Sequence, residues 1–135
     1  MFSFFKIFFK SITQKKISYS YGGIDSLILN IFKIKDNGIY LDIGCGHPIK
    51  NNNTYLLNKR GSKGINIDLD EDNISLFNTY RKNDLNIATA ISDKEGESDL
   101  FFYHKRSALN TINKDNAEYQ SAKVKAIKKI KTKSL

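Results

Sequence analysis

The 135-residue chain lacks several features that would place it in a specialised protein class. It has one cysteine, Cys45, so it holds no framework of internal disulfides. No apolar run approaches the roughly 18–20 residues that a transmembrane helix needs. Neither of its two histidines stands in a cluster with metal-ligand spacing, so we expect no metal site. The whole sequence has 40% hydrophobic and 27% charged residues, which is the composition of a globular domain.

Arginine is also scarce, although 22 basic residues face 14 acidic ones and the net charge is +8. Proteins that bind nucleic acids usually use arginine, because its guanidinium binds phosphate and guanine bidentately. Lysine, isoleucine and asparagine are abundant together, which is typical of an AT-rich genome. We therefore expect no specific nucleic-acid partner. The alternative is a polyanion-binding face in the lysine-rich C-terminal tail, residues 121–135.

The first 20 residues are rich in phenylalanine. Within residues 2–12 the apolar side chains recur at helical spacing, with Lys6 and Lys10 on the other side. Two interpretations fit this segment: a helix that covers a sheet, or weak contact with a membrane surface. The lysines interrupt the apolar region and no small-residue cleavage site follows, so the pattern is not that of a signal peptide. We expect a cytoplasmic protein.

From residue 21 onward, helical and extended hydrophobic patterns alternate. The expected helices are residues 24–35, 54–59 and 71–81, and the expected strands are residues 39–43, 63–68 and 85–91, with a further extended segment at 99–103. This order predicts an α/β fold with a parallel sheet and crossover helices. Ligands of such sheets bind beyond the carboxyl ends of the strands, so we expect the chemistry just after Ile43, Ile67 and Ile91.

Glycines or polar residues follow each of the three strands. Gly44 and Gly46 allow a tight turn and let a ligand approach the backbone without a Cβ in the way. Asp68, 24 residues after Gly44, is placed to accept hydrogen bonds from ribose hydroxyls. Ser92 and Asp93 follow the third strand, where they would meet the edge of a base. Together these residues predict a pocket for an adenosine-like ligand.

The residues around the glycine turn narrow the choice of ligand. The dinucleotide fingerprint Gly-x-Gly-x-x-Gly fails here because its last position is Ile49. Asp42 places a carboxylate before the turn, which would repel a pyrophosphate but suits a cationic amino group. S-adenosylmethionine (SAM) carries an ammonium and a sulfonium, so the pattern favours it over NAD. Cys45, between the glycines, is interpreted as a small residue that fits the turn.

Several motifs in register resemble the FkbM-type SAM-dependent methyltransferases. The resemblance covers about residues 19–111 and rests on residues 21–25, 38–48, 53–57, 59–68, 81–86 and 90–96. It implies a Rossmann-like class I methyltransferase sheet and O-methylation of a hydroxyl on a sugar or similar small acceptor. The implied SAM-binding residues are Asp42, Gly44, Cys45, Gly46, Asp68, Ser92 and Asp93. Asp42 and the two glycines would lie at the methionine end, and Ser92 and Asp93 near the adenine; no catalytic base is identified.

The later strands of the family and its Asp-x-Glu-Gly segment have no match in this chain. We therefore expect only the N-terminal portion of the methyltransferase domain, about three parallel strands, in residues 21–120. One hypothesis is an active enzyme that binds a small-molecule or glycan acceptor. The other is a truncated, non-catalytic remnant that at most binds SAM or a partner protein. A three-stranded sheet with a bare edge predicts self-association for the remnant.

Overall fold

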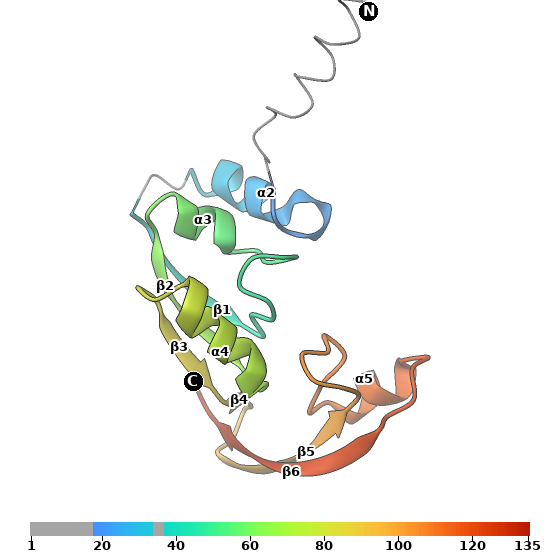
Figure 1. Cartoon of the computed structure of the whole chain (residues 1–135). Helices are drawn as coiled ribbons and strands as arrows, with labels where there is room; N and C mark the ends of the chain where they lie inside the picture. The colour runs from blue at the N-terminus through green and yellow to red at the C-terminus, as the bar shows by residue number, and fades with distance from the viewer. Residues whose placement is uncertain (1–17, 34–36) are drawn as a thin grey trace, which may run out of the picture.

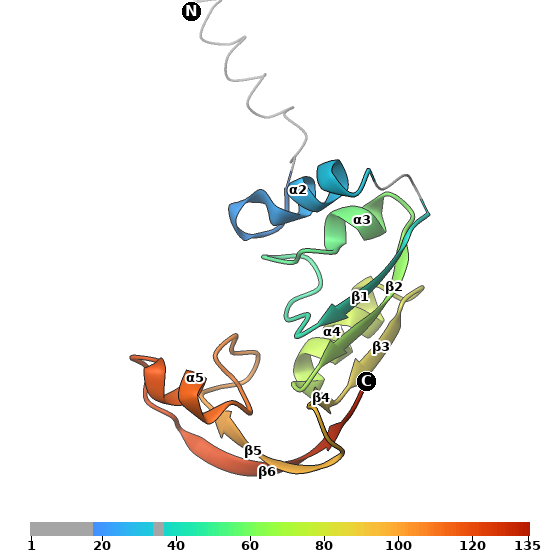
Figure 2. The ribbon, with the colours of Figure 1, turned by 180° about the vertical axis from the view of Figure 1, so that it is seen from behind.

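The computed structural model describes residues 18–33 and 37–135, so the amphipathic segment at 2–12 lies outside the described residues. The chain is a mixed α/β structure with two small sheets (Figures 1 and 2). In chain order the elements are the 3-10 turn η1 (Tyr21–Gly23), α2 (Ile24–Ile31), β1 (Ile39–Ile43), α3 (Tyr55–Lys59), β2 (Lys63–Asp68), α4 (Glu71–Tyr80), β3 (Leu85–Ala88), β4 (Ala90–Ile91), β5 (Gly96–Phe102), α5 (Lys114–Tyr119) and β6 (Ala126–Lys133). Within the described residues, no helix has the length and hydrophobicity to cross a bilayer.

The first sheet has the strand order β1-β2-β3, and all three strands are parallel. The expected parallel sheet with flanking helices is therefore present, and β1 and β2 span the predicted residues. Helix α4 follows β2 after two residues, because Asp70 caps its first turn by accepting the N–H of Asp72 at 3.0 Å. Because β1 and β2 are parallel, their carboxyl ends lie at the same edge of the sheet.

The prediction of a single strand over residues 85–91 is wrong. Strand β3 ends at Ala88, and β4 pairs with β6 in a second sheet of order β4-β6-β5. Residues 85–91 contain no glycine, proline or charged residue, so their pattern does not show where one sheet ends and the other begins. The switch from the first sheet to the second results from pairing with β6, some 40 residues further along the chain, whose edge forms hydrogen bonds with residues 90–91. Ser92 and Asp93 therefore follow a strand of the second sheet.

The lysine-rich stretch at residues 121–135 contains the whole of β6. This strand pairs antiparallel with β5 over its first seven residues, from Ala126 opposite Phe102 to Thr132 opposite Gly96. Its lysines lie on exposed positions, where Lys129 forms an ion pair with Asp99 at 2.7 Å. The stretch is thus part of the folded structure and supplies the central strand of the second sheet.

The two faces of the first sheet differ sharply in polarity. In-register positions place Tyr40, Asp42, Asn66, Asp68 and Asn86 on one face, and Ile39, Leu41, Ile43, Ile65, Ile67, Leu85 and Ile87 on the other. Helices α3 and α4 lie against the polar face, in front of the sheet in Figure 1 and behind it in Figure 2. We call the other side the aliphatic face. Most of it is uncovered: Ile39 is 92% exposed and Leu85 57%.

Candidate functional site

The loop after β1 makes a tight turn through two glycines. Gly44 and Gly46 have φ values of 72° and 61°, a left-handed conformation that favours glycine. The N–H groups of Gly44 and Cys45 both donate to the carbonyl of Ile67, at 2.8 and 3.1 Å. No atom lies within 4 Å of a Cβ built on either glycine, so the space in front of the turn is open to a ligand.

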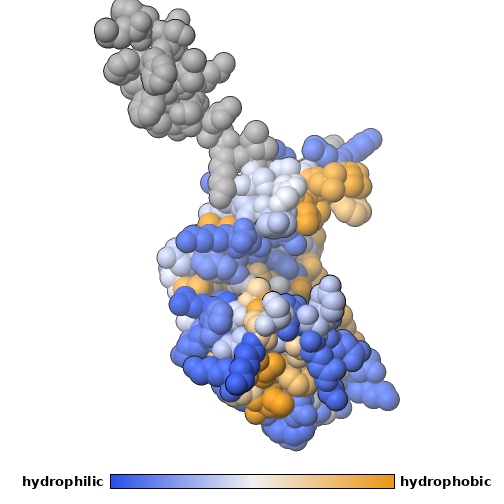
Figure 3. Space-filling view, turned by 90° about the vertical axis from the view of Figure 1, so that its right-hand side faces the viewer, coloured by the Kyte–Doolittle hydropathy of each residue, from blue (hydrophilic) through white to orange (hydrophobic). Residues whose placement is uncertain are grey.

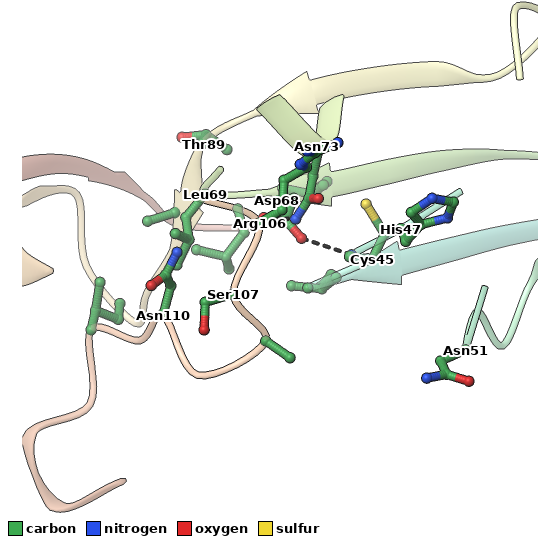
Figure 4. A pocket seen from close by; sticks show the side chains of 18 of the residues that line it. Cys45, His47, Asn51, Asp68, Leu69, Asn73, Thr89, Arg106, Ser107 and Asn110 are labelled. Carbon is green, nitrogen blue, oxygen red and sulfur yellow. Dashed lines mark hydrogen bonds between the residues drawn. The ribbon is translucent and has the colours of Figure 1, made fainter. Parts of the chain in front are cut away.

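Asp68, the last residue of β2, joins this turn to the start of α4. Its Oδ2 accepts the N–H of Gly46 at 2.7 Å, the dashed line in Figure 4, and its Oδ1 accepts the N–H of Asp70 at 2.8 Å. Burial raises the pKa of this carboxyl above its ordinary value, although the two amide hydrogen bonds oppose the shift. The carboxylate is thus fixed in orientation at the carboxyl edge of the sheet.

A cavity of about 470 Å³ opens beyond this edge (Figure 4). Its volume lies in the range of roughly 300–1,000 Å³ that is usual for small-molecule sites. Its walls come from the loop after β1, the end of β2, the connection between β3 and β4, and residues 106–112. Apolar side chains from the strand ends, Ile43, Ile67 and Ile91, alternate there with polar groups. This mixture suits a ligand with both a flat apolar part and hydroxyl groups.

Four of the sequence-predicted site residues line this cavity, namely Gly44, Cys45, Gly46 and Asp68. Asp42, Ser92 and Asp93 do not. Asp42 points to the helix-covered face, where its Oδ2 accepts the hydroxyl of Thr54 at 2.7 Å. The Ser92 hydroxyl donates to the carboxylate of Asp93 at 3.0 Å, and this pair lies beyond the end of β4.

Other residues of the cavity carry no signal in the sequence. Thr89 lies where the third predicted strand breaks, and Arg106, Ser107 and Asn110 come from the loop after β5. This loop is tied to the first sheet by Asp70, whose Oδ2 accepts the N–H of Arg106 at 2.6 Å. Because that contact spans 36 residues, no local pattern could have placed the loop at the site.

Cys45 does not have the environment of a catalytic thiol. It is 5% exposed, and burial together with the charges of Asp68 and Asp42 raises its pKa. Its thiol is therefore protonated near neutral pH. Among the described residues, no group of three His, Cys, Asp or Glu side chains could hold a metal ion.

Comparisons with models of protein families, with curated proteins and with solved structures find no match. Function is therefore inferred from the motifs and from the geometry of the cavity. A fixed carboxylate and an open glycine turn face the same space, so the walls can orient a ligand that carries hydroxyl groups.

Proposed function

We propose that this chain is a SAM-binding methyltransferase domain of the FkbM type, which methylates a hydroxyl group of a sugar or similar small acceptor. One observation carries the proposal: the Gly44–Gly46 turn and the Asp68 carboxylate meet at the wall of one cavity, at the carboxyl edge of a parallel sheet. The motifs that resemble the family supply the same residues. The class I methyltransferase fold is part of this proposal.

The walls of the cavity fit the parts of SAM. Oδ1 of Asp68 accepts the N–H of Asp70 and the side-chain amide of Asn73, whereas Oδ2 accepts the N–H of Gly46 and keeps acceptor capacity for a ribose hydroxyl. The open space in front of the glycines admits the amino-acid end of the cofactor. Apolar side chains such as Ile67 and Ile91 offer surface to the adenine. We assign the adenine end to residues 89–91, in place of Ser92 and Asp93.

The residues of the chain would act by holding and orienting the two reactants. SAM, when bound, supplies an electrophilic methyl group. Orientation of a hydroxyl oxygen towards it can account for much of the rate, because well-placed reactants reach effective molarities of about 10⁵–10⁸ M. Asp42, held by Thr54 behind the glycine turn, adds negative potential for the cationic end of the cofactor without direct contact.

Isothermal titration with SAM and with S-adenosylhomocysteine tests the proposal. Asp68→Asn removes the charge and one acceptor oxygen, so we expect affinity to fall by about tenfold or more. Asp93→Asn makes the same change outside the cavity and should leave affinity unchanged. Circular dichroism shows whether each variant is folded. Folded wild-type protein that binds neither compound would refute the proposal.

A second candidate function is a non-catalytic module that associates with a second copy of itself. The aliphatic face favours it, because Ile39, Leu41 and Leu85 are 92%, 51% and 57% exposed on a continuous three-stranded surface. Hydrophobic surface is visible along the right-hand edge of the side view in Figure 3. Two such faces can pack about 10 Å apart, as the sheets of a sandwich do. Full burial of one leucine is worth about 1.5–3 kcal/mol.

Light scattering coupled to gel filtration tests this candidate. The wild-type chain should be a dimer, and Leu41→Glu should make it monomeric by placing a charge in the interface. Leu27→Glu is the matched control, because Leu27 is 55% exposed on α2 and away from the aliphatic face. A wild-type chain that stays monomeric at 100 µM contradicts the self-association. SAM binding without methyl transfer, in a dimeric chain, would favour this candidate over the enzyme.

A further inference from the structure

Three basic side chains line the cavity: His47 and Lys50 from the loop after β1, and Arg106 from the loop after β5. Lys50 and Arg106 are exposed on its rim. Of the ion pairs formed by the described residues, none includes either of them. Their charges therefore face the cavity and solvent without a neutralising carboxylate.

The hydrogen bonds of His47 determine which of its nitrogens carries the proton. Its Nδ1 accepts the N–H groups of Ile49 and Lys50, both at 3.1 Å. Nδ1 is thus unprotonated, and the proton of the neutral ring is on Nε2. Burial, with the positive charges of Lys50 and Arg106, holds the pKa of His47 below its ordinary value. The ring therefore offers one N–H donor near neutral pH.

The backbone of Arg106 is held in an unusual conformation. Its φ of 56° lies in the left-handed region, which side chains with a Cβ seldom adopt. Asp70 keeps it there by accepting the Arg106 N–H at 2.6 Å and the Asn110 amide at 3.4 Å. Because Asp70 also caps α4, the rim residue is tied to the start of the helix that follows β2.

The charges that line the cavity do not balance. Lys50 and Arg106 carry two positive charges, and Asp68 supplies the one carboxylate of the lining. Both oxygens of Asp68 already accept backbone N–H groups. SAM carries an ammonium, a sulfonium and a carboxylate, so its own net charge is positive. The cavity with this cofactor would thus hold an excess of positive charge, which an anion would neutralise.

We propose that the second molecule bound in this cavity is an anion: a hydroxyl compound that carries a carboxylate or phosphate group, held by Lys50, Arg106 and the Nε2–H of His47. Its role as methyl acceptor rests on the proposed function, whereas the anion site itself does not. Hydrogen bonds from the charged groups of Lys50 and Arg106 to an anion belong to the stronger class, and they would select acidic or phosphorylated sugars over neutral ones.

The experiment titrates folded full-length protein, with and without saturating S-adenosylhomocysteine, and follows binding by amide NMR shifts. The probes are glucuronate, glucose 6-phosphate, inorganic phosphate and glucose. We expect the anionic sugars to bind at least about tenfold more tightly than glucose, with an affinity that falls as salt rises. Lys50→Gln with Arg106→Gln should remove this preference. Arg60→Gln with Lys94→Gln, the same charge change away from the cavity, should keep it.

The outcomes separate this proposal from the proposed function. If S-adenosylhomocysteine binds but the anionic sugars bind no better than glucose, the proposal is wrong and the SAM site stands. If the anions bind and S-adenosylhomocysteine does not, the anion site stands and the methyltransferase proposal fails. If the Lys50 and Arg106 variant weakens S-adenosylhomocysteine but not methylthioadenosine, the cations hold the cofactor carboxylate instead, which also overturns the proposal. Inorganic phosphate binding as tightly as the sugar phosphate would show a phosphate site without sugar recognition and would contradict it.

Discussion

Arg81 and Asp84 form a fully buried ion pair between the end of α4 and the start of β3, with 2.9 Å between Nε and Oδ2. The guanidinium also donates to Asn52 and Thr54, at 3.1 and 3.0 Å. Phe77 lies 4.9 Å from it. The pair therefore joins the loop beneath the glycine turn to the polar face of the sheet, and its removal should destabilise the fold.

The expected size of the effect follows from this geometry. At 2.9 Å and an effective dielectric constant of about 20, the direct attraction is about 6 kcal/mol, before the cost of desolvation. Removing one partner of a buried pair typically costs about 3–5 kcal/mol, because the other charge stays buried. We expect that cost for Arg81→Met, which keeps most of the apolar stem. Asp84→Asn keeps the shape and acceptor of its side chain but leaves the arginine unpaired, so its cost should be similar.

Urea denaturation followed by far-ultraviolet circular dichroism measures these free energies of unfolding. The loss of unfolding free energy in the double variant should be smaller than the sum of the two single losses by about 2–3 kcal/mol. The reason is that the double variant leaves no unpaired charge buried, whereas each single variant does. The exposed pair of Lys129 and Asp99 is the matched control, and no measurable coupling is expected there. Additive losses at Arg81 and Asp84, within about 0.5 kcal/mol, would refute the reasoning.

Three further predictions concern single residues. Gly64→Ala should lower the free energy of unfolding by about 1–3 kcal/mol, because the added Cβ would overlap the ring of Tyr40. A urea titration that gives the same free energy of unfolding for the variant and the wild type would contradict this. Burial alone would raise the pKa of Asp25, but hydrogen bonds, among them that from the Tyr19 N–H at 2.7 Å, lower it below its ordinary value of 3.8. The ionised Asp25 therefore stabilises the fold above pH 3.8, and this stabilisation is lost as the pH falls through the lower pKa of the folded state. Thermal denaturation from pH 5 to pH 2 should thus show a steeper loss of stability for the wild type than for Asp25→Asn. Cys45 should react with iodoacetamide much more slowly in native protein than in urea at pH 8, since burial raises its pKa; equal rates would show that the thiol is accessible.

Much of the candidate site could be predicted because its residues stand directly beside strand ends. Strands β1 and β2 are short apolar runs bounded by turn residues, and both span the predicted residues. The carboxyl ends of parallel strands share one edge, so Gly46 and Asp68 had to lie near each other, and they are joined by a hydrogen bond of 2.7 Å. Local pattern and simple topology were sufficient for that part.

The remainder of the site depends on partners that are distant in the sequence. Ser92 and Asp93 were placed at the edge of the first sheet because residues 85–91 contain no glycine, proline or charged residue, yet residues 90–91 pair with β6 in another sheet. Arg106 lies on the exposed loop after β5, and its contact with Asp70, 36 residues earlier in the chain, holds it at the rim of the cavity. Arg81 is charged and directly follows α4, and its neighbours in the sequence do not indicate that its side chain is fully buried.

The sequence alone determined the alternation of strand and helix, the parallel order that follows from it, and the position of a glycine turn and a carboxylate at strand ends. These follow from periodicity, backbone conformation and the direction of the chain. Only the tertiary structure decided where β3 ends, which loop closes the cavity and that the polar face of the sheet, rather than the aliphatic one, lies under α3 and α4. The reason is physical: each depends on contacts between segments tens of residues apart, whose free energy is no property of either segment by itself.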